Sequence, residues 1–322
     1  MKVRAYITHK LEESNADCQD YFRLNSGKKK IAISDGVSQS IFSAKWAELL
    51  VKEYTDTDVD DISESIPKLQ KKWQAYARQQ LTELESIGQS TWMLENCLME
   101  SQGAGATFCG VHFDKDGSWD GYVLGDSCLL EVSNENKILT FYPSIENGFG
   151  NSPDYFDSFS KGRGGILPIN GKLTEGNKLL LVTDPLGEFL YKKKIENKEQ
   201  AYIEQLLALS SYNDFLDVVD RLRASEAMHN DDSTLIIVEN DGREELSVVD
   251  SKTIEDLLTS EKLKYGEETI QENKQIALEK LNSLTDKDLP KKCRKCKRSR
   301  ELLNALNKKT ELSQVNIHSS SD

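Results

Sequence analysis

Short apolar segments that begin or end at an aspartate recur along this chain, and they constrain its fold more than any other feature. Asp35 follows the segment "IAIS", and Asp184 follows "LLLVT". The full set is Asp20, Asp35, Asp126, Asp184, Asp231 and Asp232. Such segments, rich in β-branched and aromatic residues, are typical of strands. Because each aspartate lies where a strand meets a loop, we expect one rim of a sheet to gather them.

The spacing of these segments favours antiparallel pairing over parallel βαβ units. Alternating residues in "GAGATFCGVHF" predict one strand, and "SWDGYVLGDSCLLEVS" predicts two strands around a Gly125-Asp126 turn. "DDSTLIIVE" is predicted as the final strand. Apolar residues at helical spacing predict helices from about Ser40, as the N-cap, to Tyr54 and from about 66 to 84. The pattern indicates an α+β fold.

The overall charge excludes some classes of partner. A net charge of −13 argues against general affinity for nucleic acids, because an acidic surface repels phosphates. No apolar run approaches the roughly 20 residues of a membrane helix, and the start "MKVRAYITHK" lacks the features of a signal peptide. We therefore expect a cytoplasmic protein with reduced cysteines and no membrane partner.

Bringing the aspartates together carries an electrostatic cost. Two unit charges about 4 Å apart repel by about 4 kcal/mol at an effective dielectric of about 20. One or two divalent cations would remove this cost, and an all-oxygen ligand set suits Mg²⁺, Mn²⁺ or Ca²⁺. A single aspartate at a strand end is also a common cap or turn former. Capping therefore stays open at each position, and the metal hypothesis depends on the set.

Six segments, read in order, resemble the motifs of the metal-dependent protein phosphatases, the type 2C family. They are "CQDYF", "AISDGVSQS", "GAGATF", "GYVLGDS", "LLLVTDPL" and "DDSTLIIV". The resemblance covers about residues 1–240 and is closest to the bacterial branch. It implies an αββα sandwich of two antiparallel sheets flanked by helices. It also implies a serine/threonine protein phosphatase that hydrolyses phosphomonoesters with a metal-activated water.

The resemblance also implies roles for individual residues. Asp35 would bridge two Mg²⁺ or Mn²⁺ ions, and the carbonyl of Gly36 would hold one of them. Asp184 and Asp231 would complete the ligands of the second ion. Asp20 would act in catalysis by orienting metal-bound water.

A third ion and the phosphate-holding group are further implications. Asp126 matches a position associated with a third ion in some relatives. Eukaryotic relatives hold the phosphate with an arginine, for which Arg4 and His9 are the nearest candidates here. His9 lies in "ITHK", which resembles the Ser-His opening of the bacterial branch. We predict phosphate contact or proton donation by His9, and an ordinary surface histidine is the alternative.

Three departures from the family pattern leave other functions open. Pro185 follows Asp184 where the family has glycine, Val37 replaces a histidine, and the upstream arginine has no clear equivalent. The alternative function is that of a pseudophosphatase, which binds phosphoproteins without turnover. A metal hydrolase of small phosphorylated molecules is a further alternative.

The composition changes after about residue 240. Residues 241–322 are rich in Glu and Lys, contain the basic segment "KKCRKCKRSR", and finish in a polar stretch typical of disorder. We predict a phosphatase domain over 1–240 and a charged helical tail with a disordered end over 241–322. The tail is either a solvated basic helix or a docking element for a protein partner. The expected substrate is a phosphorylated protein, a kinase or its target.

Overall fold

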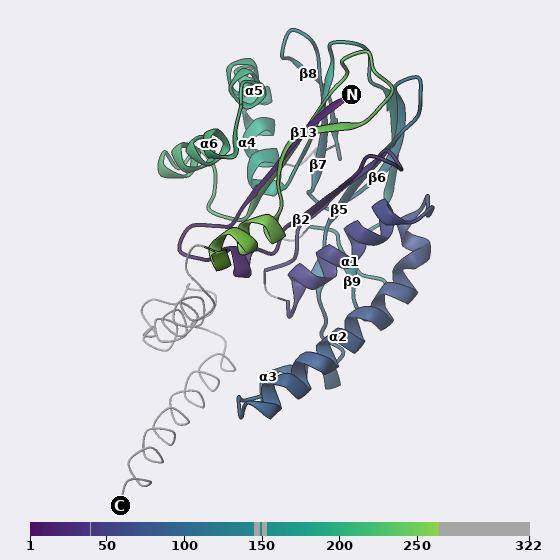
Figure 1. The fold of residues 1–322 in the computed structure, drawn as a ribbon, viewed down its shortest axis with the longest axis vertical. Coiled ribbons are helices and arrows are strands. Elements are labelled where there is room, and N and C mark those ends of the chain that lie inside the picture. The colour runs from purple at the N-terminus through teal and green to yellow at the C-terminus, as the bar shows by residue number, and fades with distance from the viewer. Residues whose placement is uncertain (39, 145–148, 150–152, 264–322) are drawn as a thin grey trace, which may run out of the picture. The chain divides into compact units, whose positions relative to one another are not determined.

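Two β-sheets packed face to face form the centre of the fold, and helices cover both outer faces (Figure 1). The computed structural model describes residues 1–38, 40–144, 149 and 153–263. A first compact unit comprises Met1–Leu257, and all elements named below belong to it. The predicted α+β class and the αββα layering are confirmed.

The first sheet has six strands in the order β13-β1-β12-β11-β7-β8. They are β1 Lys2–Thr8, β7 Cys128–Val132, β8 Ile138–Tyr142, β11 Lys178–Val182, β12 Ser233–Glu239 and β13 Ser247–Lys252. Neighbours pair antiparallel, except that β13 runs parallel to β1. The expectation of two purely antiparallel sheets is therefore wrong at this edge, and β12 is not the final strand.

The second sheet has five strands in the order β10-β6-β5-β3-β2, and every neighbouring pair is antiparallel. They are β2 Tyr21–Asn25, β3 Lys30–Ser34, β5 Phe108–Phe113, β6 Ser118–Leu124 and β10 Leu167–Lys172. The short strands β4 Gly105–Ala106 and β9 Phe156–Asp157 pair separately. The strands predicted around the Gly125-Asp126 turn do not pair with each other, because β6 and β7 belong to different sheets.

In the described part of the chain, α1 Ser43–Asp56 and α2 Ile66–Ser86 cover the five-stranded sheet, α3 Trp92–Met99 follows α2 and touches the core beneath them through Leu98, and three helices cover the six-stranded sheet. Those on the six-stranded sheet are α4 Asp184–Ile195, α5 Glu199–Leu207 and α6 Tyr212–Ala224. Two short 3-10 turns are η1 Asn15–Asp17 and η2 Ile62–Ser65. Helix α1 begins three residues after the predicted N-cap at Ser40, with Phe42 at the cap position.

Alternation along the strands separates the core into layers. In β1, Val3, Ala5 and Ile7 lie in the cluster between the two sheets, whereas Tyr6 lies in the cluster beneath the helices of the six-stranded sheet. This is the period of two that a strand buried on both faces requires. The apolar runs in the sequence thus fix both faces of the central strands.

The first compact unit extends past the boundary expected near residue 240. Strand β13 and the residues up to Leu257 belong to it, because β13 adds to the sheet beside β1. The second unit, Leu258–Asp322, is described only to residue 263, so the basic segment 291–300 lies outside the described residues. Cys18, Cys97, Cys109 and Cys128 are free thiols. No described helix has the length and apolar character needed to cross a membrane.

Trp46 gives a test of this packing. Its ring is fully buried, and its indole N–H donates to the carbonyl of Phe156 at 2.8 Å. We expect Trp46→Ala to lower the free energy of unfolding by about 3–5 kcal/mol. Trp92→Ala is the matched control, because this ring is 53% exposed and should change stability by less than about 0.5 kcal/mol. Urea unfolding measures both, and equal losses would contradict the layering.

Candidate metal centre

Strand pairing brings the aspartate-bearing ends to one end of the sandwich. In the six-stranded sheet, Thr8 at the end of β1 lies opposite Ser233 at the start of β12. The end of β11 also lies beside the start of β12. In the five-stranded sheet, Tyr21 at the start of β2 lies opposite Ser34 at the end of β3. Antiparallel pairing therefore places the segments that follow β3 and β11 beside those that precede β2 and β12.

Asp20 connects the two sheets at this end. Its side chain is 1% exposed, and Oδ2 accepts hydrogen bonds from the hydroxyls of Thr183 at 2.9 Å and Thr234 at 2.7 Å. Its Oδ1 is buried and has no hydrogen-bond donor among the described residues. Burial raises the pKa of Asp20, with the charge of Asp232 adding to it, and the threonine hydroxyls act against that shift. One carboxylate oxygen is thus held in place, while the other has no hydrogen-bond donor in the described part of the chain.

Asp35 lies at the end of β3 and is fixed through its backbone. Its amide donates to the hydroxyl of Thr107 at 3.2 Å, and its carbonyl accepts from the amide of Thr107 at 2.8 Å. Burial raises the pKa of the Asp35 carboxyl, and the charges of Asp20 and Asp184 raise it further. Asp35 is therefore in the electrostatic field of carboxylates that come from both sheets.

Gly36 allows β3 to end against the start of α1. A Cβ atom here would lie 2.8 Å from the Cβ of Ser43 and 2.9 Å from the carbonyl oxygen of Gln19. Its amide donates to that same carbonyl at 3.2 Å. A side chain would push apart the segments that hold Asp20 and Asp35, so only glycine fits.

Asp126 lies where the chain passes from one sheet to the other. Gly125, with φ of +84°, makes this crossing, and a Cβ there would lie 2.4 Å from the carbonyl oxygen of Asp154. The Oδ1 atom of Asp126 is buried and has no hydrogen-bond donor among the described residues. Burial, followed by the charge of Asp184, raises the pKa of Asp126 to about 7. The crossing thus delivers a second partnerless carboxylate oxygen to the cluster.

Asp184 is the first residue of α4. Burial raises its pKa, and a contact of 3.2 Å from Oδ2 to Nε2 of His229 opposes that shift. The other ring nitrogen of His229 lies 3.1 Å from Oε2 of Glu188. Pro185 lies in the first turn of α4, where a backbone N–H has no helical partner, so the departure from the family's glycine removes no helical hydrogen bond.

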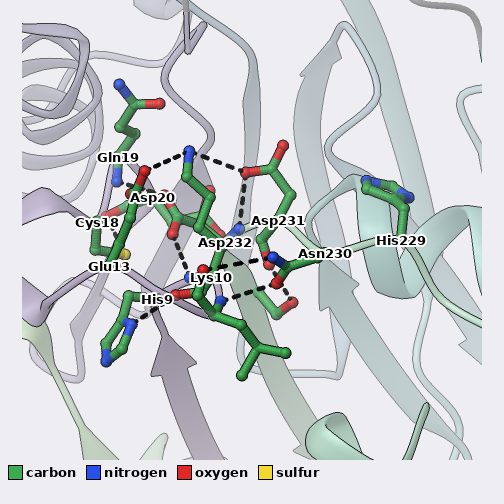
Figure 2. A network of polar contacts seen from close by, with 12 residues as sticks. His9, Lys10, Glu13, Cys18, Gln19, Asp20, His229, Asn230, Asp231 and Asp232 are labelled. Carbon is green, nitrogen blue, oxygen red and sulfur yellow. Dashed lines mark hydrogen bonds and ion pairs between the residues drawn. The ribbon is translucent and has the colours of Figure 1, made fainter. Parts of the chain in front are cut away.

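The two aspartates that precede β12 differ in their partners (Figure 2). Asp232 is 3% exposed, and its two oxygens accept from the backbone amides of Lys10 at 2.9 Å and Gln19 at 2.7 Å. Asp231 accepts from the amide of Asp232 at 2.9 Å, and its Oδ1 lies 3.8 Å from Nζ of Lys10. Asp232 therefore ties loops together, and Asp231 is the more available oxygen donor.

The two predicted phosphate-holding residues are not brought into this cluster. The guanidinium of Arg4 donates to the carbonyls of Leu207 and Leu209 and pairs with Glu239. The ring of His9 contacts the carbonyl of Lys10 at 2.8 Å, and Figure 2 shows it directed away from the aspartates. Both side chains serve local contacts in this structure.

Three basic residues beside the aspartates were missed in the sequence. Lys10 pairs with Asp231 and, at 3.3 Å, with Glu13; although burial opposes it, these carboxylates raise the pKa of Lys10. Lys10 adjoins His9 in "ITHK", and His229 lies two residues before Asp231. Their nearness to these motifs could have identified both residues from the sequence. The third is buried Arg223, which donates to the carbonyls of His9 at 3.1 Å and Asp231 at 2.6 Å. No local pattern marks it.

The cluster is rich in negative charge and in oxygen donors. Among the described residues, no group of three or more His, Cys, Asp or Glu side chains is arranged to hold a metal ion. The chemistry of the donors nevertheless fits hard cations. Two buried carboxylate oxygens lack a hydrogen-bond donor among the described residues, and the aspartates raise one another's pKa values. Oxygen ligands of this kind suit Mg²⁺ or Mn²⁺.

Asp126→Asn in the metal-free protein tests this electrostatic reading. The folded pKa of about 7 exceeds the unfolded value of about 3.9, so the stabilising contribution of the protonated group is present below about pH 4 and is lost as the pH rises through 7. The amide does not titrate. We therefore expect the free energy of unfolding of the variant to exceed that of the wild type by an amount that grows with pH. The difference should reach on the order of 2–4 kcal/mol at about pH 8.

Urea unfolding in a chelator, at pH values between about 5 and 8, measures this gain. The control is Asp217→Asn, whose side chain is exposed on α6 and should show no such trend. If the difference in free energy of unfolding between variant and wild type were the same at both ends of the pH range, it would be inconsistent with the raised pKa of Asp126.

Comparisons with known proteins find structural likeness alone. No protein-family model matches the sequence, and no curated protein matches it. Three solved structures show the kind of likeness found. The serine/threonine phosphatase of S. agalactiae is 17% identical, with a TM-score of 0.46, over 74% of this chain and 98% of that one.

The other two are similar to the same degree. Serine/threonine phosphatase Stp1 from Staphylococcus aureus is 14% identical, with a TM-score of 0.47, over 73% of this chain and 93% of that one. The catalytic domain of serine/threonine protein phosphatase PstP, solved with two manganese ions, is 14% identical, with a TM-score of 0.44. The match covers 73% of this chain and 96% of that one. All three are serine/threonine phosphatases, the class that the sequence motifs resemble, and we infer the chemistry of this chain from its own residues.

Proposed function

We propose that this protein is a metal-dependent serine/threonine protein phosphatase. The observation that supports this most directly is the group of aspartates from both sheets, with two buried oxygens that lack a donor among the described residues. If these aspartates served only as caps at strand ends, the fold would have no reason to place their carboxylates where they repel one another. Divalent cations would remove this repulsion, and this electrostatic relief supports the proposal of a cation site.

The residues divide into those that hold cations and those that hold the loops. Asp35, Asp184 and Asp231, with the carbonyl of Gly36, would hold two Mg²⁺ or Mn²⁺ ions. Asp126 would reach a third position, and Asp20 would orient water through its partnerless Oδ1. When bound, the cations supply a water of lowered pKa and neutralise charge on the phosphoryl oxygens.

Lys10 takes the role that we first expected of His9 or Arg4. Its ammonium group lies 3.8 Å from the Asp231 carboxylate, and its side chain is 21% exposed. A cation bound by Asp231 would release Lys10 from this ion pair and leave its ammonium group at the edge of the site, held by Glu13 at 3.3 Å. Lys10 would then bind a phosphoryl oxygen of the substrate and orient it toward the attacking water.

Asp35→Asn tests the cation site. We expect loss of the binding of two Mn²⁺ ions in calorimetry and loss of Mn²⁺-dependent hydrolysis of p-nitrophenyl phosphate by at least about 10³-fold, with the fold retained. Asp120→Asn is the control, since its side chain is exposed on β6. Unchanged Mn²⁺ binding would contradict the bridging role of Asp35. Mn²⁺ binding by the wild type without turnover on any phosphoester would instead identify a pseudophosphatase.

Lys10→Gln tests the phosphate contact. The loss of a charge-assisted hydrogen bond of about 1.5–3 kcal/mol predicts a fall in kcat/KM for a phosphoserine peptide of roughly 10- to 150-fold. His9→Gln is measured in the same assay. A larger fall in kcat/KM for His9→Gln than for Lys10→Gln would assign the phosphate contact to His9. Comparing kcat/KM of the wild type on phosphopeptides and on small phosphometabolites distinguishes a protein phosphatase from a hydrolase of small molecules.

A further inference from the structure

A cluster of exposed apolar side chains lies at the end of α2 and along α3. Ile87 is 67% exposed, Trp92 53%, Met93 50% and Met99 74%. Figure 1 shows α3 following the end of the long helix α2. Other exposed large apolar side chains of the described chain lie on different elements, including β8, β10 and β13. Scattered exposed residues are common, whereas four exposed large apolar side chains within residues 87–99 are concentrated in one short segment, as at an interaction surface.

Helix α3 is apolar on two opposite faces. Leu94 is 6% exposed, and Leu98 packs against the core cluster beneath α1 and α2, so this face holds α3 to the body. Trp92 and Met99, seven residues apart, share another face, and Glu95 lies between them at helical spacing. A helix with apolar residues on both sides is normally covered on both sides. The outer face of α3 therefore has the composition of an interface.

The charge of the segment is entirely negative. No lysine or arginine occurs between Arg78 and Lys115. The acidic residues between them that belong to the α2 and α3 segments are Glu83, Glu85, Glu95 and Glu100. Tryptophan and methionine are enriched in interface cores, from which lysine is depleted. We name the set of Ile87, Trp92, Met93 and Met99 with these four glutamates the α3 surface.

We propose that the α3 surface binds a basic, amphipathic helical segment of a partner protein. Apolar side chains of that segment pack on Trp92 and Met99. Its lysines or arginines meet the glutamates of the same α2 and α3 segments, which gives the charge complementarity that selects a basic partner over an acidic one. This binding goes beyond the proposed hydrolysis, because it needs neither the cations nor turnover.

A binding titration with the full chain tests the proposal. The probe is a fluorescently labelled amphipathic peptide of leucine and lysine, and a second peptide carries glutamate in place of lysine. The variant is Trp92→Ser combined with Met99→Ser. The control is Leu139→Ser on β8, which removes an apolar side chain of 53% exposure elsewhere. Thermal unfolding confirms that each variant retains the fold.

We expect the lysine peptide to bind the wild type and the Leu139→Ser control alike. The double variant should bind at least about tenfold more weakly. Binding should also weaken as salt screens the glutamates. The proposal is overturned if the wild type does not bind, if the double variant equals the control, or if the glutamate peptide binds equally well. It is also overturned if sedimentation shows self-association that the double variant abolishes, since a second copy would then be the occupant.

Discussion

Buried carboxylates that act on one another are the constraint on which the rest of this structure depends. Asp35 and Asp184 come from different sheets, and burial raises both pKa values. The charges of Asp20 and Asp184 raise the pKa of Asp35 further, and the charge of Asp231 adds to that of Asp184. Such an arrangement opposes folding when all groups are ionised. It persists because strand pairing on both sides of an apolar core fixes the positions of the strand ends.

The residues around the cluster show how the fold limits this cost without removing it. The threonine hydroxyls that bond Asp20 and the backbone amides that bond Asp232 each satisfy part of a buried carboxylate. Buried Arg223 contributes a positive charge nearby, yet its guanidinium donates to backbone carbonyls. The supporting groups therefore hold loops in place, and the carboxylate oxygens of Asp20 and Asp126 that face no donor among the described residues stay available for cations.

The sequence predicted those parts of the structure that local pattern determines. Alternation and helical spacing predicted the strands and helices, and the resemblance to the phosphatase family implied their layers. The strand-end aspartates predicted that one rim of a sheet gathers them. It did not predict that Gly125 carries the chain from one sheet to the other, because pairing partners depend on residues far along the chain. Strand β13 was missed for the same reason, since its exposed, polar sequence becomes a strand only through pairing with β1.

The same distinction bears on the two predicted phosphate-holding residues, which the structure does not bring into the cluster. Arg4 and His9 were the nearest candidates for the upstream arginine of the family, and His9 also lies in "ITHK", which resembles the Ser-His opening of the bacterial branch. Both lie on or next to β1, but Arg4 lies four residues before its end at Thr8, roughly 13 Å along a strand. Lys10 follows that end and turns back toward Asp231, as its ion pair shows. Position along β1 thus separates Arg4 from the aspartates, whereas side-chain direction separates His9, whose ring points away from them, from Lys10, whose ammonium group faces Asp231.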